Sequence, residues 1–146
     1  MKIALGADHA GYILKETLKK YLEDKGIEFK DYGTFKEDSC DYPEYAFKVG
    51  QAVSSQEADL GILVCGTGIG MSITANKMKG IRAALVNDVP GAQMSRLHND
   101  ANILCLGGRT TQEKDALEIL ETWLNTSFEG GRHQSRLNLI AQLTGL

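Results

Sequence analysis

The sequence predicts a single-domain α/β protein, a three-layer Rossmann-like fold in which helices flank a five-stranded parallel sheet. Short apolar runs alternate with longer amphipathic segments along the whole chain of 146 residues. This alternation is typical of parallel sheets with helices on both faces. No internal repeat, linker or low-complexity stretch divides the chain, so residues 1–146 are expected to form one domain.

Five runs account for the expected strands, at residues 2–6, 27–32, 60–64, 81–86 and 102–106. The first run, Lys-Ile-Ala-Leu-Gly, is typical of a buried strand, whereas the second alternates between apolar and polar residues. Ligands of such sheets bind outside the carboxyl ends of the strands, near the point where the strand order reverses. Functional residues are therefore expected at that edge.

Helices are expected at residues 10–25, 41–56 and 71–78, around 93–97, and at 111–124 and 133–143. Gly26 ends the first helix, and Asp41 is placed to cap the start of the second. We expect the apolar face of the first helix to pack against the sheet. Helical spacing puts five side chains on that face: Ile13, Leu14, Leu18, Tyr21 and Leu22.

Charge and hydropathy exclude two classes of partner. With a net charge of −3 and 24% charged residues, the chain has no broad basic surface for nucleic acid. No apolar run reaches the length of a membrane span, and the first residues lead into a strand rather than a signal peptide. The cysteines are odd in number and lack metal-ligand spacing. We expect a cytoplasmic protein that binds neither nucleic acid nor membrane.

The most informative motif is Cys-Gly-Thr-Gly-Ile-Gly at residues 65–70, between the third expected strand and the helix that follows it. Glycine has no Cβ, so the backbone N–H groups of such a loop can turn toward one bound anion. A helix start also favours the thiolate form of a neighbouring cysteine. The motif predicts a base or nucleophile, Cys65, beside an oxyanion site. The alternative is a tight turn with a buried inert cysteine.

The spacing of this loop excludes three familiar uses. A dinucleotide-binding fingerprint needs a glycine where Met71 stands. A Walker loop needs Gly-Lys followed by Ser or Thr, and the chain has Ile69-Gly70-Met71 instead. A cysteine phosphatase loop needs an arginine near position 71 to hold the phosphate dianion, and none is present.

Three further clusters fall at expected strand ends or helix starts: Asp8-His9 after the first strand, His98-Asn99-Asp100 before the fifth, and Arg109 after it. We expect them to converge with the glycine loop on one edge of the sheet. Histidine titrates near neutral pH, which suits acid–base chemistry. The alternatives are a helix N-cap with a solvated imidazole for the first cluster and a helix C-terminal cap for the second.

Two arginines, Arg132 and Arg136, lie four positions apart on the last expected helix, directly after a Gly-Gly pair. Two guanidinium groups on one helix face match a phosphate dianion. We favour a phosphate pocket that also includes Arg109 and His9, and the alternative is a solvated helical pair. The other two arginines have no further candidate phosphate ligand near them in the sequence and are expected to be structural: Arg82 and Arg96.

Six motifs occur in order along the chain: Gly6-Ala7-Asp8-His9-Ala10-Gly11, Asp41-Tyr42-Pro43, Cys65-Gly66-Thr67-Gly68-Ile69-Gly70, Ala75-Asn76-Lys77, His98-Asn99-Asp100-Ala101-Asn102 and Gly130-Gly131-Arg132-His133-Gln134. With them, essentially the whole sequence resembles the type B ribose-5-phosphate isomerases. The wider family includes galactose-6-phosphate and allose-6-phosphate isomerases. The thiol identifies the branch that uses cysteine rather than glutamate as its base.

The resemblance implies an aldose–ketose isomerase that interconverts ribose 5-phosphate and ribulose 5-phosphate through a cis-enediolate, with no cofactor and no metal. Cys65 would be the base, Thr67 would help relay the hydroxyl proton, and His98 would open the furanose ring with Asp8 nearby. Loop amides would bind the enediolate oxygen, from Gly66, Thr67, Gly68, Ile69 and Gly70. The other substrate contacts implied are His9, Arg109, Arg132 and Arg136 to the phosphate, and Tyr42 and Asn99 to the sugar. For Asp41 we expect no more than a helix start.

The resemblance also implies a homodimer with active sites at the subunit interface, with a tetramer as the alternative. We expect the loop of His98 to reach the pocket that contains the partner's Cys65. The last helix comes after the sheet is already covered, so it has apolar surface to bury. Four of its side chains make up this surface: Leu137, Leu139, Ile140 and Leu143.

Three other functions stay open. In the first, the substrate of the isomerase is a six-carbon sugar, such as allose 6-phosphate or galactose 6-phosphate. In the other two, the protein is a non-catalytic module that binds a phosphosugar, or a structural subunit of a heteromeric galactose-6-phosphate isomerase. The presence of Cys65, Thr67 and His98 disfavours these two, because binding alone does not need all three.

Overall fold

Five parallel strands form one sheet, in the order β2-β1-β3-β5-β4, in the computed structural model, which describes residues 1–146. After β1 the chain adds β2 on one side of the sheet, and after β3 it adds β4 and β5 on the other side. The strand order therefore reverses between β1 and β3. This is the place where such sheets bind ligands. The strands are β1 (Lys2–Ala7), β2 (Glu28–Asp31), β3 (Leu60–Cys65), β4 (Ala83–Leu85) and β5 (Ile103–Gly107). The predicted fold class is confirmed.

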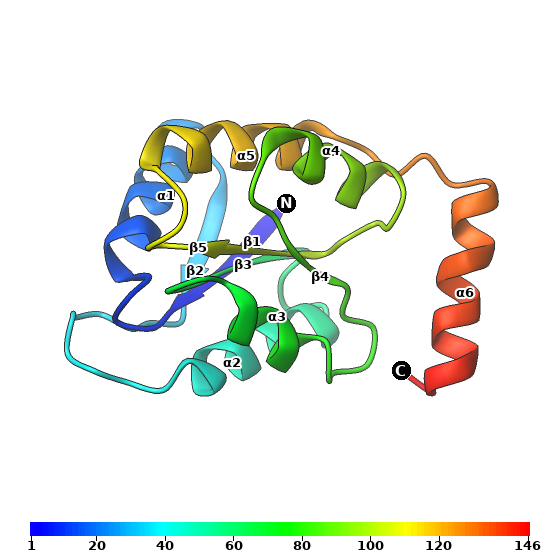
Figure 1. The fold of residues 1–146 in the computed structure, drawn as a ribbon, viewed down its shortest axis with the longest axis horizontal. Helices are drawn as coiled ribbons and strands as arrows, with labels where there is room; N and C mark the ends of the chain where they lie inside the picture. Colours follow the sequence, from blue (N-terminus) through cyan, green and yellow to red (C-terminus); the bar gives the residue numbers. More distant parts are fainter.

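Helices cover both faces of the sheet, as Figure 1 shows: α1, α4 and α5 lie on one face, and α2 and α3 lie on the other. The last helix, α6, stands apart from both layers at one end of the molecule (Figure 1). None of these helices has the length and apolar character that crossing a membrane requires. They are α1 (Tyr12–Asp24), α2 (Tyr42–Ser54), α3 (Ile69–Ala75), α4 (Val89–Leu97), α5 (Glu113–Asn125) and α6 (Arg132–Thr144).

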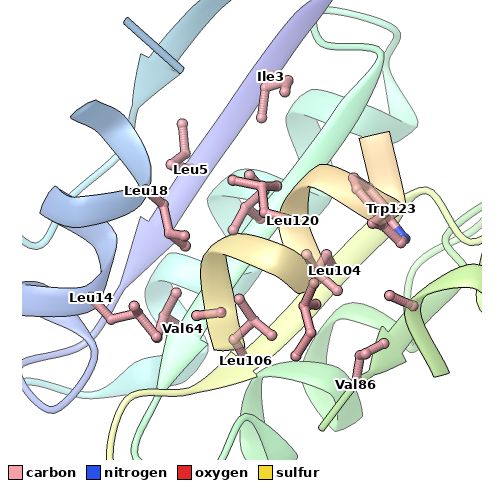
Figure 2. Packing of buried hydrophobic residues seen from close by; sticks show 14 of the residues in the cluster. Ile3, Leu5, Leu14, Leu18, Val64, Val86, Leu104, Leu106, Leu120 and Trp123 are labelled. Carbon is pink, nitrogen blue, oxygen red and sulfur yellow. The ribbon is translucent and has the colours of Figure 1, made fainter. Parts of the chain in front are cut away.

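Alternate strand residues supply two separate hydrophobic cores. Ile3 and Leu5 point to the core under α1 and α5, which also contains the fully buried Trp123 (Figure 2). Ala4, between them, belongs to the core under α2 and α3, where Met71 is fully buried. Burial of one such large apolar side chain contributes about 1.5–3 kcal/mol, so the two cores hold the strand ends in fixed places.

The prediction for the apolar face of the first helix is wrong for one of its five residues, Ile13. Leu14, Leu18 and Leu22 are buried against the sheet, whereas the side chain of Ile13 is 65% exposed. Leucines four positions apart form a stripe along the helix, and a residue one position away is turned by about 100° from that stripe. Ile13 therefore faces solvent despite its apolar character.

The bounds of most elements differ by a few residues from those expected. The third helix begins at Ile69 rather than at residue 71 and ends at Ala75, and β4 is shorter than the apolar run that predicted it. The fourth helix begins at Val89, because Asp88 Oδ1 accepts a hydrogen bond from the N–H of Gly91 at 2.7 Å. This cap directly precedes a Val-Pro pair, and proline favours the first turn of a helix.

The second helix begins as predicted, after Asp41. The Asp41 side chain makes no capping hydrogen bond, although the residue stands at the N-cap position. Pro43 in the first turn instead suits the helix start, because its fixed φ is helical and it has no N–H to satisfy.

Candidate active site

Three of the predicted clusters meet at the carboxyl edge of the sheet. In the strand registers, Ala7 lies beside Val64 and Cys65 lies beside Gly107, so the ends of β1, β3 and β5 are level with one another. Asp8 and His9 follow the first of these ends, the glycine loop follows the second, and Arg109 follows the third. Their predicted convergence is confirmed.

Cys65 ends β3 and its side chain is nearly buried, with 4% exposure. Its Sγ accepts a hydrogen bond from the N–H of Gly68 at 3.2 Å. Gly68 has a φ of +78°, and a Cβ there would lie 2.7 Å from a methyl group of Leu85. Only glycine fits both the backbone conformation and the space, so this residue type is required for the amide to face the sulfur.

The five amides predicted to bind an anion fall into two groups. The N–H of Gly68 is already engaged by Cys65, and the N–H of Ile69 donates to Thr67 Oγ1 at 3.3 Å. The N–H groups of Gly66, Thr67 and Gly70 make no hydrogen bond within the chain. These three amides are available to an external acceptor, whereas the first two shape the loop.

Asp8 is nearly buried and organises the turn into α1. Its Oδ1 accepts hydrogen bonds from the N–H groups of Ala10 at 2.9 Å and Gly11 at 3.1 Å. The structure therefore supports the alternative of a local capping role for this carboxylate, and its Oδ2 makes no hydrogen bond within the chain. The next residue, His9, accepts a hydrogen bond at Nδ1 from the N–H of Cys40 at 3.2 Å.

Two larger side chains border the glycine loop. The backbone N–H of Arg109 donates to the carbonyl oxygen of Gly66 at 3.0 Å, and its guanidinium group lies across that glycine. The ring of Tyr42, at the start of α2, packs so closely on Gly70 that a Cβ there would collide with it. Both predicted contact residues thus lie at the walls of the Cys65 loop.

The prediction that His98, Asn99 and Asp100 converge on this same edge is wrong. His98 is the C-cap of α4, and these residues precede β5. The segment before a parallel strand lies at the amino edge of the sheet, opposite to the carboxyl ends. The carbonyl of the following Asn102 confirms this position, because it accepts the N–H of Gly61 at the start of β3.

At the amino edge, the imidazole rings of His98 and His133 stack, with centroids 4.2 Å apart and planes 15° apart. His133 is buried in the first turn of α6, and its Nε2 has no hydrogen-bond partner. Burial, and then the neighbouring His98 and Arg132, hold the pKa of His133 below its usual value. His133 was not among the predicted site residues, although its position beside Arg132 in the sequence is a signal that points to it.

Arg132 and Arg136 are exposed on α6 and form no ion pair. They share this helix with His133, whose ring stacks on that of His98. The predicted pocket that joins them to Arg109 and His9 is therefore not assembled within one chain. Figure 1 shows α6 at the end of the molecule opposite to the loop that enters α2.

The two arginines predicted to be structural hold the turn after His98. Arg82 and Arg96 both pair with the carboxylate of Asp100, at 3.1 Å and 3.0 Å. Arg82 also donates from Nε to the backbone carbonyl of Asn99 at 3.2 Å. These contacts stabilise a turn in which Asp100 has a φ of +44°.

One cluster offers possible metal ligands: His98, Glu129 and His133, whose ligand atoms lie within 4.8 Å of one another. A metal ion lies in the plane of each imidazole that binds it, along the lone pair of the nitrogen. Two rings stacked within 15° of parallel cannot both direct a lone pair at one ion. The arrangement therefore does not fit a metal centre.

A groove of about 390 Å³ separates α6 from the β4 edge of the sheet. Its walls are mainly apolar and include Ile81, Ala83, Leu137 and Ile140. Farther along α6, the side chain of Leu143 is 76% exposed. The predicted uncovered apolar surface of the last helix is present.

Comparisons with known proteins agree with this architecture over nearly the whole chain. A family model described as Ribose/Galactose Isomerase matches residues 3–140. Ribose-5-phosphate isomerase B of Escherichia coli is 46% identical over 97% of this chain and 95% of its own. The structure of Clostridium thermocellum ribose-5-phosphate isomerase B has a TM-score of 0.98 and 49% identity, and the match covers 99% of this chain and 98% of that one.

A third relative carries a ligand. The structure of ribose-5-phosphate isomerase B from Mycoplasma genitalium with bound ribulose-5-phosphate has a TM-score of 0.95 and 38% identity, over 99% of this chain and 96% of that one. The likeness thus extends to a protein of this fold that holds a phosphorylated ketose.

Proposed function

The chain belongs to the ribose/galactose isomerase family, and from this we propose that it interconverts ribose 5-phosphate and ribulose 5-phosphate. Relatives that bear this activity in their names match it over nearly their full lengths, and one of them holds ribulose-5-phosphate. The observation that carries the proposal is the buried thiol of Cys65, hydrogen-bonded to a glycine-loop amide at the sheet edge where ligands bind.

Cys65 is the base of the reaction. Its thiolate removes the proton from C2 of the open-chain aldose, and the electron pair forms a C1–C2 double bond while the carbonyl oxygen takes the negative charge. The hydroxyl proton then passes from the oxygen on C2 to the oxygen on C1, with Thr67 as relay. Return of the proton from Cys65 to C1 completes the ketose and regenerates the thiolate. The hydrogen bond from Gly68 supports this role, because a charged sulfur is the stronger acceptor.

The cis-enediolate oxygen is bound by the free amides of the loop. Gly66, Thr67 and Gly70 have unpartnered N–H groups beside Cys65. Preorganised donors at a developing oxyanion are usually the largest catalytic contribution, about 3 kcal/mol for each donor. Proton transfers by side chains of the protein, with loop amides at the enediolate oxygen, account for every step, so the proposed reaction uses no metal ion and no other cofactor.

The complete site requires two chains. Cys65, His9 and Arg109 lie at the carboxyl edge, whereas His98 and the α6 arginines lie at the amino edge of the same chain. A homodimer related by a twofold axis places the amino-edge group of one chain over the carboxyl edge of its partner, twice. A pair of such dimers would form the tetramer.

In this arrangement the partner's His98 opens the furanose ring, next to Asp8, and the partner's Asn99 contacts the sugar with Tyr42. The phosphate lies between His9 and Arg109 of one chain and Arg132 and Arg136 of the other. The exposed apolar face of α6 supports the proposal, because a surface of this kind on a small protein is usually covered by a second subunit. Unpaired cysteines, Cys40, Cys65 and Cys105, support a cytoplasmic location.

A coupled assay of the purified protein tests the proposal. Ribose 5-phosphate, allose 6-phosphate and galactose 6-phosphate are supplied side by side, and the ketose produced is measured. The five-carbon substrate is expected to have the highest kcat/KM. Preference for a six-carbon phosphate would assign the chain to another branch of the family, and binding without turnover of all three would identify a non-catalytic module.

A further inference from the structure

The loop of residues 33–40 joins β2 to α2 and runs along the carboxyl edge of the sheet (Figure 1, cyan). The proposed reaction uses no side chain of this loop. Its last residue nevertheless contacts the site, because the N–H of Cys40 donates to Nδ1 of His9 at 3.2 Å. The loop thus holds one of the residues assigned to the phosphate.

This hydrogen bond determines where the proton of the imidazole lies. A neutral imidazole has one N–H group and one bare nitrogen, and only the bare nitrogen accepts a hydrogen bond. Because Nδ1 of His9 accepts from a backbone amide, Nδ1 carries no hydrogen and the N–H group of the ring is at Nε2. Nε2 is then a donor, which is what a phosphate oxygen needs.

We propose that residues 33–40 are a positioning element for His9, in which the Cys40 amide holds the ring in the Nε2–H tautomer to donate to the substrate phosphate. This inference rests on the proposed role of His9 as a phosphate contact. It adds that the orientation and the tautomer of the ring are set before substrate arrives. A ring already in its bound state loses less entropy on binding.

The root of the loop is anchored by a buried ion pair. Lys15 of α1 is fully buried, and its Nζ lies 2.5 Å from Oδ2 of Asp31, the last residue of β2. The other oxygen of Asp31 accepts the N–H of Gly33 at 2.8 Å. The Lys15 ammonium also lies 5.2 Å from the ring centroid of Phe35. A charge buried in this way is costly to displace, so the first turn of the loop is rigid.

The same root is bonded to the strand that carries His9. The N–H of Ala7 donates to the carbonyl of Gly33, and the N–H of Thr34 donates to the carbonyl of Ala7, both at 2.7 Å. Ala7 ends β1 two residues before His9. The start of the loop is therefore hydrogen-bonded to the backbone just before His9. At the other end of the loop, the Cys40 amide is hydrogen-bonded to the His9 imidazole.

Nitrogen NMR of the wild-type protein tests the tautomer directly, in the free protein and with inorganic phosphate. We expect a scalar coupling across the hydrogen bond between the Cys40 amide nitrogen and His9 Nδ1, and a directly bonded proton on Nε2. A proton on Nδ1, or no coupling in either sample, overturns the proposal. This measurement needs no variant and does not depend on activity.

Two variants of Cys40 separate the amide from the thiol. Cys40→Pro removes the N–H, and the matched control Cys40→Ala removes the sulfur but keeps the N–H. Since one hydrogen bond contributes about 0.5–1.5 kcal/mol, Cys40→Pro should raise KM for ribose 5-phosphate and the inhibition constant of inorganic phosphate about three- to tenfold. Cys40→Ala should keep both within about twofold of the wild type, and kcat should change less than KM in either variant.

The double variant that combines Cys40→Pro with His9→Ala tests whether Cys40 acts through the His9 imidazole. If Cys40 acts through His9, Cys40→Pro causes no further loss once the imidazole is absent. Equal effects of Cys40→Pro in the presence and absence of His9 overturn the proposal. If His9→Ala alone leaves phosphate inhibition unchanged, the phosphate role of His9 fails, and the nitrogen coupling still decides the tautomer. If Cys40→Pro does not fold, the wild-type nitrogen spectrum decides between the two tautomers by itself.

Discussion

At the carboxyl edge of the sheet, side chains gather around a glycine loop, and at the amino edge they gather around two stacked imidazole rings. The first group is built from residues that end or directly follow β1, β3 and β5. It is held by short-range hydrogen bonds, such as that from the N–H of Gly68 to Sγ of Cys65. The second group joins the end of α4 to the distant α6, by the contact of His98 with His133.

The difference between the two edges shows which groups of the proposed site come from each edge of the sheet. The carboxyl edge is arranged within one chain, with the Cys65 thiol, free loop amides and the His9 imidazole, which accepts a backbone N–H. The amino edge offers His98 and two arginines that have no partner in their own chain. In the proposed dimer, each chain supplies at its amino edge the groups that its partner's carboxyl edge lacks, so both sites are completed by one twofold axis. Substitutions at either edge test whether the proposed site is divided between two chains in this way.

The largest effect is expected for Cys65→Ala. A general base contributes about a hundred- to ten-thousandfold, so turnover should fall by that factor while a phosphorylated substrate analogue binds with little change. Iodoacetamide should inactivate the wild type, and bound sugar phosphate should protect it. Single-turnover rates and calorimetry of analogue binding check these outcomes.

The control for this variant is Cys105→Ala, since Cys105 is buried in β5 and has no role in the proposed reaction. Burial, and then the neighbouring Cys65, raise the pKa of the Cys105 thiol, so it stays protonated and unreactive. Retention of most turnover in Cys65→Ala would remove the base from the mechanism.

The second prediction addresses the two edges together. Cys65→Ala and His98→Asn chains should each be nearly inactive on ribose 5-phosphate. When they are unfolded together and refolded as an equal mixture, half the dimers contain both kinds of chain, and each of these has one intact site. Activity should then approach roughly a quarter of the wild-type value. A mixture that stays inactive would mean that both residues of a site come from one chain.

The third prediction separates ring opening from proton transfer. His98→Asn should be roughly a hundredfold slower on ribose 5-phosphate, which is mostly cyclic, because acid–base assistance to ring opening is lost. It should be much less impaired on ribulose 5-phosphate, which cannot close a furanose ring. Equal loss of the chemical step for both substrates, under single-turnover conditions, contradicts the assignment.

The fourth prediction concerns the phosphate. A charge-assisted hydrogen bond contributes about 1.5–3 kcal/mol, so Arg132→Ala or Arg136→Ala should raise KM about ten- to a hundredfold. Turnover of an unphosphorylated sugar should be nearly unchanged, and Arg96→Lys is a control outside the pocket. Equal losses for substrates with and without phosphate would make the two arginines structural.

The smallest effect on turnover is expected from Lys15→Met, which alters stability at the carboxyl edge. Burial raises the pKa of Asp31, but hydrogen bonds from Lys15, Lys19 and the Gly33 amide outweigh this, so the pKa lies below its usual value. A lowered folded-state pKa contributes stability above the unfolded value of about 3.9, and this stability is lost as the pH falls through the folded value.

Lys15→Met should therefore lower the free energy of unfolding at pH 7 by about 1.5–3 kcal/mol. It should also flatten the loss of stability below about pH 4, because less of the pKa shift of Asp31 remains. Urea unfolding, followed by circular dichroism across this pH range, measures both effects. An unchanged acid profile would show that Lys19 alone holds the carboxylate, since its Nζ lies 2.8 Å from Asp31.

Local patterns determined much of this protein. Alternating segments predicted the parallel sheet, because apolar strands and amphipathic helices each bury a characteristic face. The glycine loop was predictable because its contacts are local: Cys65 and Gly68, which interact, are three positions apart. A stripe of leucines likewise marked the buried face of α1, although Ile13 beside it proved to be exposed.

The tertiary structure alone decided which residues meet across long stretches of chain. Nothing in the pattern around Lys15 separates it from the exposed lysines, and its burial follows from the place of Asp31 at the end of β2. The stack of His98 on His133 depends on where α6 lies, and few contacts with the sheet hold that helix. Short-range contacts are set by spacing along the chain, whereas these long-range contacts exist only once packing has brought the elements together.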